Sequence, residues 1–279
     1  MKTSLSVWSL HQAMFAKEMD NAAFVEFAAA AGVEGVELLS VFWNDDGGEI
    51  GRIRDALART NLAMACFGAC NNLCASDADE RTRQLADITS SVDRAVTFRA
   101  RVVRVFSGDK AGDVSYEQAS DWIIDGLKEA SAYAASQGVT LCLENHGLFA
   151  GKAEQVLNVI REVGSEHLRS TFDTGNFLLV DESPSEAAVK LADHISHVHL
   201  KDFALVEQDY EGKIYTSLSG QRYAGFAPGE GSVDLPFILG HLKDNGYNGR
   251  LTVEYEGDEE QKQGSERSIL NLRRMLSAL

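Results

Sequence analysis

The chain is poor in basic residues: its 279 residues include 26 Lys and Arg against 42 Asp and Glu, a formal net charge of −16. A protein that binds duplex nucleic acid must meet the phosphates with clustered basic side chains, so no nucleic-acid partner is expected. Attachment to an anionic membrane surface is disfavoured for the same reason. The imbalance still allows a small anionic ligand held by one or two local cations.

Long apolar runs are also missing, and no window approaches the roughly 18 uninterrupted apolar residues of a membrane span. The N-terminal segment MKTSL does not open a long apolar stretch with a small-residue cleavage site, so no secretory signal is expected. Four cysteines are too few for a disulfide framework. These absences predict a cytoplasmic protein with no membrane partner.

Three of the cysteines, Cys66, Cys70 and Cys74, recur at short intervals and invite an iron–sulfur interpretation. The radical-SAM pattern has two residues between its last two cysteines, whereas three intervene here. The run also follows the third expected strand rather than the first. We therefore expect Cys66 in the core and the other two in a loop.

Short β-rich apolar runs alternate with longer amphipathic segments along the whole chain. Helical patterns follow each expected strand, and eight such units without an obvious linker predict one α/β domain over residues 1–279, a closed (β/α)₈ TIM barrel. The alternative, a doubly wound open sheet, should carry a glycine-rich phosphate turn after its first strand, and residues 4–14 contain no glycine. The expected strands are 4–9, 35–39, 63–68, 102–106, 140–144, 170–173, 197–200 and 251–254. The clearest helical patterns are 21–31, 50–60, 80–98, 117–137, 154–163, 186–194, 235–245 and 266–279.

Local signals mark the starts of several helices. Ser115, Asp77 and Ser183 each stand three residues before a Gln or Glu, the spacing of a capping box. One stretch, 204–233, has no clear periodicity and contains several glycines. Irregular loops of that length are usually functional in a compact domain, often as a lid or a binding loop.

Polar side chains close four of the later expected strands. Glu144 ends the run LCLE and Asp173 ends TFD, while His199 lies in HVHLKD and Glu254 in LTVEYEG. Because the C-terminal strand ends of a barrel converge on one mouth, these four side chains are expected to meet in a small volume.

Three carboxylates and an imidazole in one small volume repel one another unless a cation lies among them. Hard oxygen ligands with one imidazole suit Mn²⁺ or Mg²⁺, with Co²⁺ or Zn²⁺ as alternatives. The sequence thus predicts one divalent ion held by Glu144, Asp173, His199 and Glu254. The plainer alternative is that each residue only caps a helix or faces solvent. His197 is expected deeper in the barrel, supporting the ligands.

The order of these motifs resembles the xylose-isomerase-like TIM barrels. The matching segments run from GVEGVEL (32–38) through LENHG, FDTGN, HVHLKD and PGEG (228–231) to VEYEG. More narrowly, the chain resembles the sugar phosphate isomerase/epimerase group, which includes tagatose-3-epimerase-like, hydroxypyruvate-isomerase-like and inosose-dehydratase-like enzymes. The resemblance implies the same four metal ligands and a homodimer or homotetramer. It also implies that Glu144 and Glu254 exchange protons with the substrate.

Two positions depart from the epimerase pattern. Asn176 stands where epimerases usually have a histidine, and Ala150 stands where they carry a further glutamate. The substrate-binding pattern is therefore not the epimerase's, and the stereochemical outcome cannot be carried over.

The chemistry expected of these residues is proton transfer on a keto-polyol. Such a substrate can chelate a divalent ion through adjacent oxygens, and a carboxylate then removes the neighbouring C–H proton to give an enediolate. Returning the proton gives an epimer or an isomer, which predicts a metal-dependent isomerase or epimerase of a small sugar or polyol. Loss of a β-hydroxyl instead gives the alternative, a dehydratase (lyase) of a keto-polyol such as an inosose. Glu144 and Glu254 are the expected proton-transfer pair. Four further residues are expected to contact substrate oxygens: His146, Asn176, Lys201 and Arg222.

Two other functions share the barrel. An endonuclease-IV-like nuclease would need more metal ligands and a basic DNA-facing rim, which the charge of −16 opposes. A non-catalytic, sugar-sensing barrel is the third candidate, and residues at all four ligand positions speak against it.

Overall fold

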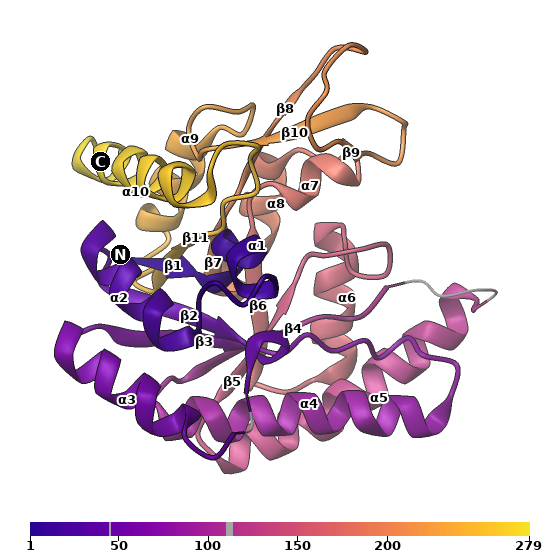
Figure 1. Ribbon diagram of the computed structural model, residues 1–279. Coiled ribbons are helices and arrows are strands. Elements are labelled where there is room, and N and C mark those ends of the chain that lie inside the picture. The colour runs from indigo at the N-terminus through magenta and orange to yellow at the C-terminus, as the bar shows by residue number, and fades with distance from the viewer. Residues whose placement is uncertain (45, 110–113) are drawn as a thin grey trace.

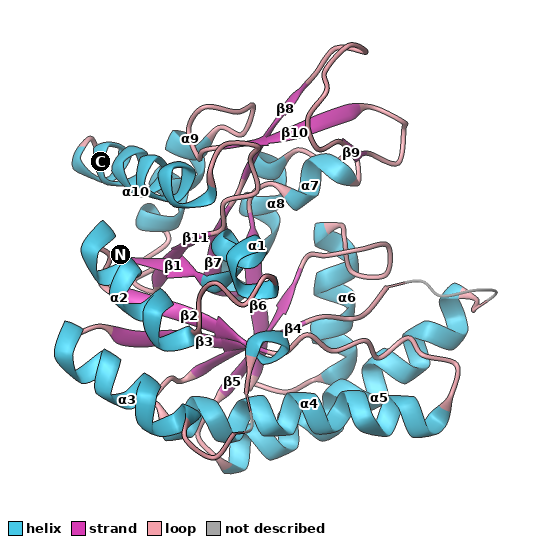
Figure 2. Cartoon of the chain, viewed as in Figure 1, coloured by secondary structure: helices cyan, strands magenta, loops and turns pink. Residues whose placement is uncertain are grey.

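The computed structural model describes residues 1–44, 46–109 and 114–279, and its central feature is a closed parallel barrel. The strands follow one another around it in the order β1-β11-β7-β6-β5-β4-β3-β2, with helices on the outside (Figures 1 and 2). This confirms the predicted (β/α)₈ fold over the open doubly wound sheet. The barrel strands are β1 (Lys2–Ser6), β2 (Gly35–Leu39), β3 (Ala63–Gly68), β4 (Val102–Val105), β5 (Thr140–Glu144), β6 (Leu168–Asp173), β7 (Ile195–Leu200) and β11 (Arg250–Val253).

The predicted caps begin their helices as expected. Ser115 and Gln118 form a reciprocal capping box, and the side chains of Asp77 and Ser183 each accept a backbone N–H three residues on. Among the described residues, no helix is long and apolar enough to cross a membrane. The longer helices are α2 (Asn21–Ala31), α3 (Glu49–Thr60), α4 (Ala78–Thr97), α5 (Tyr116–Ser136), α6 (Ala153–Val163), α8 (Pro184–Leu191), α9 (Leu235–Asp244) and α10 (Gln261–Ser277). Shorter ones are η1 (Val7–Leu10), α1 (His11–Phe15), η2 (Ser40–Phe42), α7 (Asn176–Leu179) and η3 (Ala192–His194).

Several element boundaries differ from the prediction by a few residues, and at two of them the position of a side-chain cap explains the difference. The first strand ends at Ser6, whose hydroxyl caps the 3₁₀ helix η1. The last helix begins at Gln261 rather than at Glu266, since the Glu260 carboxylate accepts the backbone N–H groups of its first turn.

The stretch 204–233, predicted as an irregular loop, contains most of a small antiparallel sheet. Its strands are β8 (Asp202–Leu205), β9 (Tyr215–Thr216) and β10 (Arg222–Phe226), paired in the order β8-β10-β9. Figure 1 shows them projecting from the barrel, and we call them the hairpin sheet. The prediction missed these strands because the stretch contains several glycines and shows no sustained alternation of polar and apolar residues.

The PGEG segment that follows β10 encloses a carboxylate. Asp202 accepts the backbone N–H groups of Gly229 and Gly231 at 2.9 Å and that of Val233 at 3.0 Å. A Cβ atom at Gly231 would lie 2.2 Å from Asp202 Oδ1, so glycine is needed for this approach. The segment therefore anchors the end of the hairpin sheet to the start of β8.

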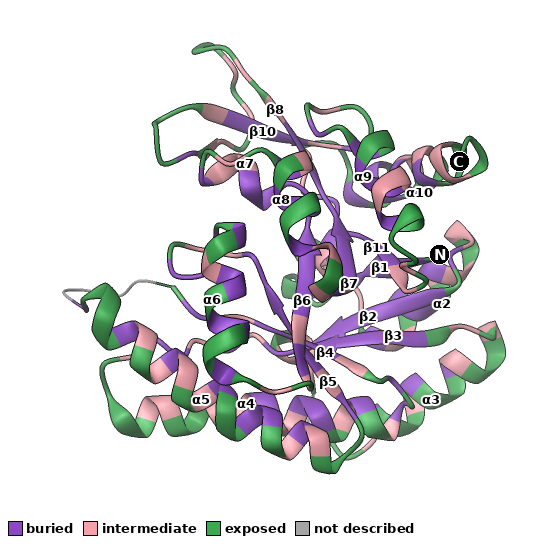
Figure 3. Ribbon diagram, turned by 180° about the vertical axis from the view of Figure 1, so that it is seen from behind, coloured by how far each residue is buried: buried purple, intermediate pink, exposed green. Residues whose placement is uncertain are grey.

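The strands are buried on both faces, as in other parallel barrels, and the outer helix faces are exposed (Figure 3). The barrel interior is polar as well as apolar. Ser4, Glu37, Arg104, His197 and Thr252 are each at most 2% exposed. Buried polar groups need hydrogen-bond or ion-pair partners, and the partners of several of these residues belong to the candidate site.

Candidate metal and substrate site

The C-terminal ends of β5, β6, β7 and β11 bring Glu144, Asp173, His199 and Glu254 together. One ligand atom from each lies within 4.8 Å of the others, and all four side chains are buried. The strand register explains the meeting, since Asp173 pairs with His199 and His199 with Thr252, two residues before Glu254. These are the four residues whose convergence the sequence predicted.

Three atoms of this cluster make no hydrogen bond to any described residue: Glu144 Oε2, Asp173 Oδ2 and His199 Nδ1. His199 Nδ1 lies 3.4 Å from Glu144 Oε2, 4.0 Å from Asp173 Oδ2 and 3.8 Å from Glu254 Oε2. Around an octahedral Mg²⁺ or Mn²⁺, neighbouring donor atoms lie about 3 Å apart and opposite ones about 4 Å apart. Glu144 Oε2 and Asp173 Oδ2 have only ion-pair contacts, with Arg104 and Lys201. Because buried polar atoms without a hydrogen bond are costly, their convergence fits a divalent ion.

Asp173 offers one oxygen to this cluster and uses the other locally. Its Oδ1 accepts the backbone N–H groups of Gly175 at 2.9 Å and Asn176 at 2.8 Å. The Asn145 side chain makes two hydrogen bonds to the Asp173 backbone: its Nδ2 donates to the carbonyl at 3.0 Å, and its Oδ1 accepts from the N–H at 2.8 Å. The Asp173 carboxylate is therefore held in one orientation, with Oδ2 toward the cluster.

Glu144 is held between a cation and an amide. Arg104 Nε lies 3.2 Å from Glu144 Oε2, and Asn176 Nδ2 donates to Glu144 Oε1 at 3.2 Å. The Arg104 guanidinium is 2% exposed and lies 3.9 Å over the Phe106 ring. Burial raises the pKa of Glu144, and the charges of His199 and Arg104 offset part of that shift.

Lys201 places an ammonium group among the carboxylates. Its Nζ lies 2.6 Å from Glu254 Oε2, 3.0 Å from Glu256 Oε1 and 3.3 Å from Asp173 Oδ2. Although burial opposes the charged form, the charges of Asp173, Glu254 and Glu256 raise the pKa of Lys201 well above its usual value. The charged Lys201 ammonium therefore offsets part of the negative charge of these carboxylates.

The pKa values of two proposed ligands are also displaced. Burial raises the pKa of Asp173 to about 6. Burial opposes the charged form of His199, but the charges of Glu37, Glu254 and Glu144 outweigh it and raise the pKa of His199 to about 10. An ion bound at this cluster would therefore displace the proton from His199 Nδ1.

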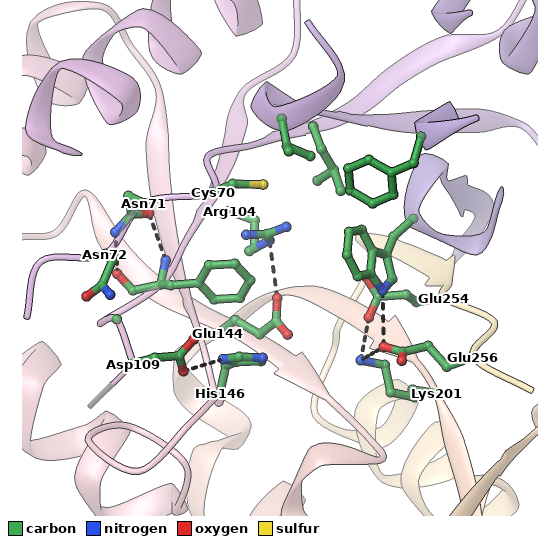
Figure 4. Close-up of a pocket in the computed structure, with 16 residues that line it drawn as sticks. Cys70, Asn71, Asn72, Arg104, Asp109, Glu144, His146, Lys201, Glu254 and Glu256 are labelled. Carbon is green, nitrogen blue, oxygen red and sulfur yellow. Dashed lines mark hydrogen bonds and ion pairs between the residues drawn. The ribbon is translucent and has the colours of Figure 1, made fainter. Parts of the chain in front are cut away.

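A cavity of about 330 Å³ opens over the cluster, a volume within the range of small-molecule sites. Its polar lining includes Arg104, Glu144 and Glu254, and its apolar lining includes Trp8 and Phe106. Figure 4 shows Glu144 and His146 on one side of the cavity and Lys201, Glu254 and Glu256 on the other. A small polar molecule with one apolar face would suit such a lining.

The residues predicted to contact substrate lie in different places. His146 and Lys201 line the cavity, and the His146 ring is 4.6 Å from the Phe106 ring. Asn176 is 7% exposed and is not among the described residues that line the cavity; its Nδ2 donates to Glu144 Oε1. Arg222 is not among the described residues that line the cavity; its guanidinium donates to Glu207 O at 3.2 Å and to Gln208 within the hairpin region. Its side chain stays there because these acceptors already hold it.

The sequence assigned no role to three charged residues that lie at or near the site, of which Glu37 and Arg104 are buried and Glu256 is partly buried. Glu37 contacts His197 and His199, Arg104 contacts Glu144, and Glu256 accepts from Trp8 Nε1 at 3.2 Å and from the Tyr215 hydroxyl. A signal was available for Glu37 and Arg104, because each is the lone charge in a short apolar strand. His197 lies behind His199, as predicted, and contacts Glu37 at 2.9 Å.

The cysteine run lies beside the cavity. Cys66 is fully buried in β3, as expected. Cys74 lies in the loop after β3, as expected, but it is buried there, and its Sγ donates to the Ser107 carbonyl at 3.4 Å. Cys70 is half-buried and lines the cavity.

Comparisons with known proteins agree with this architecture. A family model described as xylose isomerase-like TIM barrel matches residues 25–275. The inosose dehydratase of Clostridium botulinum (strain Alaska E43 / Type E3) is 31% identical over 146 residues, 51% of this chain and 49% of that protein. The match thus spans about half the length of the curated relative.

Two solved structures share the fold at low sequence identity. A D-tagatose 3-epimerase-like protein matches with a TM-score of 0.80 and 19% identity, covering 100% of this chain and 98% of that chain. A xylose isomerase-like TIM barrel protein from Mycobacterium smegmatis in complex with magnesium has a TM-score of 0.73 and 18% identity, covering 94% and 91%.

Proposed function

Because this chain belongs to the xylose isomerase-like TIM barrel family, we propose that it is a metal-dependent enzyme that dehydrates a small keto-polyol. The observation that carries the proposal is the convergence of Glu144 Oε2, Asp173 Oδ2 and His199 Nδ1, three buried atoms without a hydrogen bond among the described residues, beside a cavity that Glu144 and Glu254 line. The curated relatives, named inosose dehydratases, support the substrate class.

Glu144, Asp173, His199 and Glu254 would hold one divalent ion. Three oxygen ligands and one nitrogen favour Mn²⁺ or Mg²⁺, with Co²⁺ or Zn²⁺ as alternatives. When bound, the ion supplies positive charge that polarises a substrate carbonyl and stabilises the enediolate formed next to it.

The proton transfers belong to the two glutamates. Figure 4 shows Glu144 and Glu254 reaching the cavity from different sides, so a substrate bound over the two would meet both carboxylates. One takes the C–H proton next to the carbonyl. The other, as an acid, donates a proton to the hydroxyl of the neighbouring carbon, a C=C bond forms, and water leaves. The remaining cavity residues hold the substrate, with Lys201 and His146 as donors to its oxygens.

Two positions favour dehydration over epimerisation. Asn176, where epimerases usually have a histidine, has its amide engaged by Glu144 and the Asn145 carbonyl. Ala150, where they have a further glutamate, is fully buried. Isomerisation or epimerisation is the second candidate, and the approach of Glu144 and Glu254 from different sides favours it, since proton return to the opposite face needs two acids.

The proposal is tested by assaying a panel of inososes and ketoses in deuterated water. Mn²⁺-loaded protein is expected to convert an inosose to a product one water lighter by mass spectrometry. Chelator-treated protein should lose this activity, and added Mn²⁺ should restore it. A product of unchanged mass that has gained solvent deuterium would establish the second candidate instead. Full activity after exhaustive chelation, or no turnover of any panel member, would overturn the proposal.

A further inference from the structure

The carboxylate of Glu37 contacts both histidines of β7, and neither proposed proton transfer uses it. Glu37 lies on β2, and its Oε2 is 2.9 Å from His197 Nε2 and 3.0 Å from His199 Nε2. All three side chains are at most 1% exposed. A carboxylate in such a place needs a reason, because burying a charge is costly unless it is paired.

The chemistry of the contact decides which nitrogen of His199 carries a proton. An ionised carboxylate oxygen only accepts hydrogen bonds, so His199 must donate its Nε2–H to Glu37. A neutral His199 in that tautomer has its lone pair on Nδ1, the atom 3.4 Å from Glu144 Oε2 in the candidate ion site. The opposite tautomer would aim an N–H at the ion.

We propose that Glu37 is a positioning residue, which keeps His199 in the Nε2–H tautomer and so presents Nδ1 to a divalent ion. The inference rests on the proposed function, since it assumes that the cluster of Glu144, Asp173 and Glu254 binds an ion. Carboxylates that hold the second nitrogen of a metal-bound histidine also raise its strength as a ligand.

Glu37 is itself fixed on both oxygens. The Ser6 hydroxyl of β1 donates to Glu37 Oε1 at 3.0 Å. His197 contacts Oε2, and its Nε2 is also 3.2 Å from the hydroxyl of Thr252 on β11. The Glu37 carboxylate is thus held by the neighbouring strand β1 and by β7 across the barrel interior, which suits a group that must hold a ring in one orientation.

An alternative is that Glu37, His197 and His199 bind a second metal ion. Glu37, His197 and His199 each offer a ligand atom within 4.8 Å of the others. The distances of 2.9 and 3.0 Å from Glu37 Oε2 to the two Nε2 atoms are those of hydrogen bonds. These hydrogen bonds would have to break before the same atoms could bind an ion. We therefore take this alternative as an outcome for the test to detect.

The test compares the wild-type chain with Glu37→Leu and Glu37→Gln by calorimetric titration with Mn²⁺ after chelation. Loss of an outer-shell carboxylate typically costs about 10- to 100-fold in metal affinity, and this range is expected for Glu37→Leu. Glu37→Gln keeps the shape and loses the charge, so a smaller loss is expected. If Glu37→Leu does not fold, Glu37→Gln decides the question.

Glu49→Gln is the matched control. Glu49 is also buried and paired, accepting from Asn21 at 2.7 Å and Arg52 at 2.5 Å, but it lies outside the candidate site. Mn²⁺ affinity in this variant should stay within about threefold of the wild type, since neutralising a buried carboxylate elsewhere leaves the ligands untouched.

A spectroscopic readout separates positioning from a general role in folding. In Zn²⁺-loaded protein, ¹⁵N resonances of His199 should show a protonated Nε2 and a metal-bound Nδ1 in the wild type. In Glu37→Leu a mixture of ring states is expected. Three results would overturn this inference and leave the proposed function standing. The first is unchanged Mn²⁺ affinity in both Glu37 variants, and the second is a metal-bound Nε2 of His199 in the wild type. The third is two ions per chain in the wild type and one in the Glu37 variants. A wild-type chain that binds no Mn²⁺ would overturn the proposed function with it.

Discussion

Replacing Glu254 with glutamine is expected to lower kcat by about 10²- to 10⁴-fold, the usual contribution of a positioned general acid or base. Glutamine keeps the size of the side chain and an oxygen that can face the ion, but it cannot carry a proton. The measurement is turnover of an inosose at saturating Mn²⁺, so that weaker ion binding does not limit the rate. Solvent deuterium incorporation in the same reaction shows whether C–H cleavage is the step that fails.

The control for this variant is Glu259→Gln, a few residues further along the chain. Glu259 is 47% exposed and paired with Arg267 on the surface, so the kcat of the Glu259→Gln enzyme should match that of the wild type. A Glu254→Gln enzyme that keeps kcat within about threefold of wild type would contradict the two-carboxylate chemistry.

Replacing Lys201 with methionine is expected to destabilise the ion-free protein by about 3 kcal/mol at pH 8. The ammonium of Lys201 lies within 3.3 Å of oxygens of Asp173, Glu254 and Glu256, and without it the repulsion among these carboxylates loses its nearest shared counter-charge. Equilibrium unfolding in urea, with chelator present, measures the change. Added Mn²⁺ should stabilise the variant more than the wild type, because the ion then has no ammonium to compete with.

The loss should depend on pH in a definite direction. Burial raises the pKa of Asp173 to about 6, above its usual value of 3.8, so the folded chain gains stability by keeping this carboxyl protonated at low pH. That gain is complete below about pH 4 and is lost as the pH rises through 6. Removal of Lys201 should therefore cost less at pH 4 than at pH 8.

Lys213→Met is the matched control, since Lys213 contacts the same Glu256 carboxylate at 3.2 Å but is 51% exposed. A loss below about 1 kcal/mol is expected for an exposed pair. Equal losses in the two lysine variants, or a Lys201→Met loss that Mn²⁺ fails to reduce, would contradict the view that Lys201 balances the charge of the cluster.

The barrel and its four converging side chains could be predicted because both leave a periodic mark in the sequence. Strands and helices alternate, and each of Glu144, Asp173, His199 and Glu254 falls where an apolar strand ends. In a barrel that position alone directs a side chain to the mouth.

Other parts depend on contacts that sequence spacing does not carry. Glu37 meets its histidine partners on β7 across the barrel interior, and only the closure of the sheet brings those strands face to face. Arg104 meets Glu144 from the neighbouring strand β4, but the spacing of the sequence does not show which way its long side chain turns. Asn176 follows Asp173 closely, but its amide turns toward Glu144 because α7 begins there. Arg222 lies on β10, inside a stretch predicted as an irregular loop, so its orientation could not be foreseen.

The most direct test is calorimetric titration of the chelator-treated chain with Mn²⁺, comparing wild type with Asp173→Asn. The asparagine can still accept the N–H groups of Gly175 and Asn176 through one oxygen, so the turn should survive while the ligand oxygen is lost. The prediction is one ion per chain for the wild type and a loss of more than about 100-fold in affinity for the variant. No saturable binding by the wild type, or equal affinity in Asp173→Asn, would contradict an ion site at the end of this barrel.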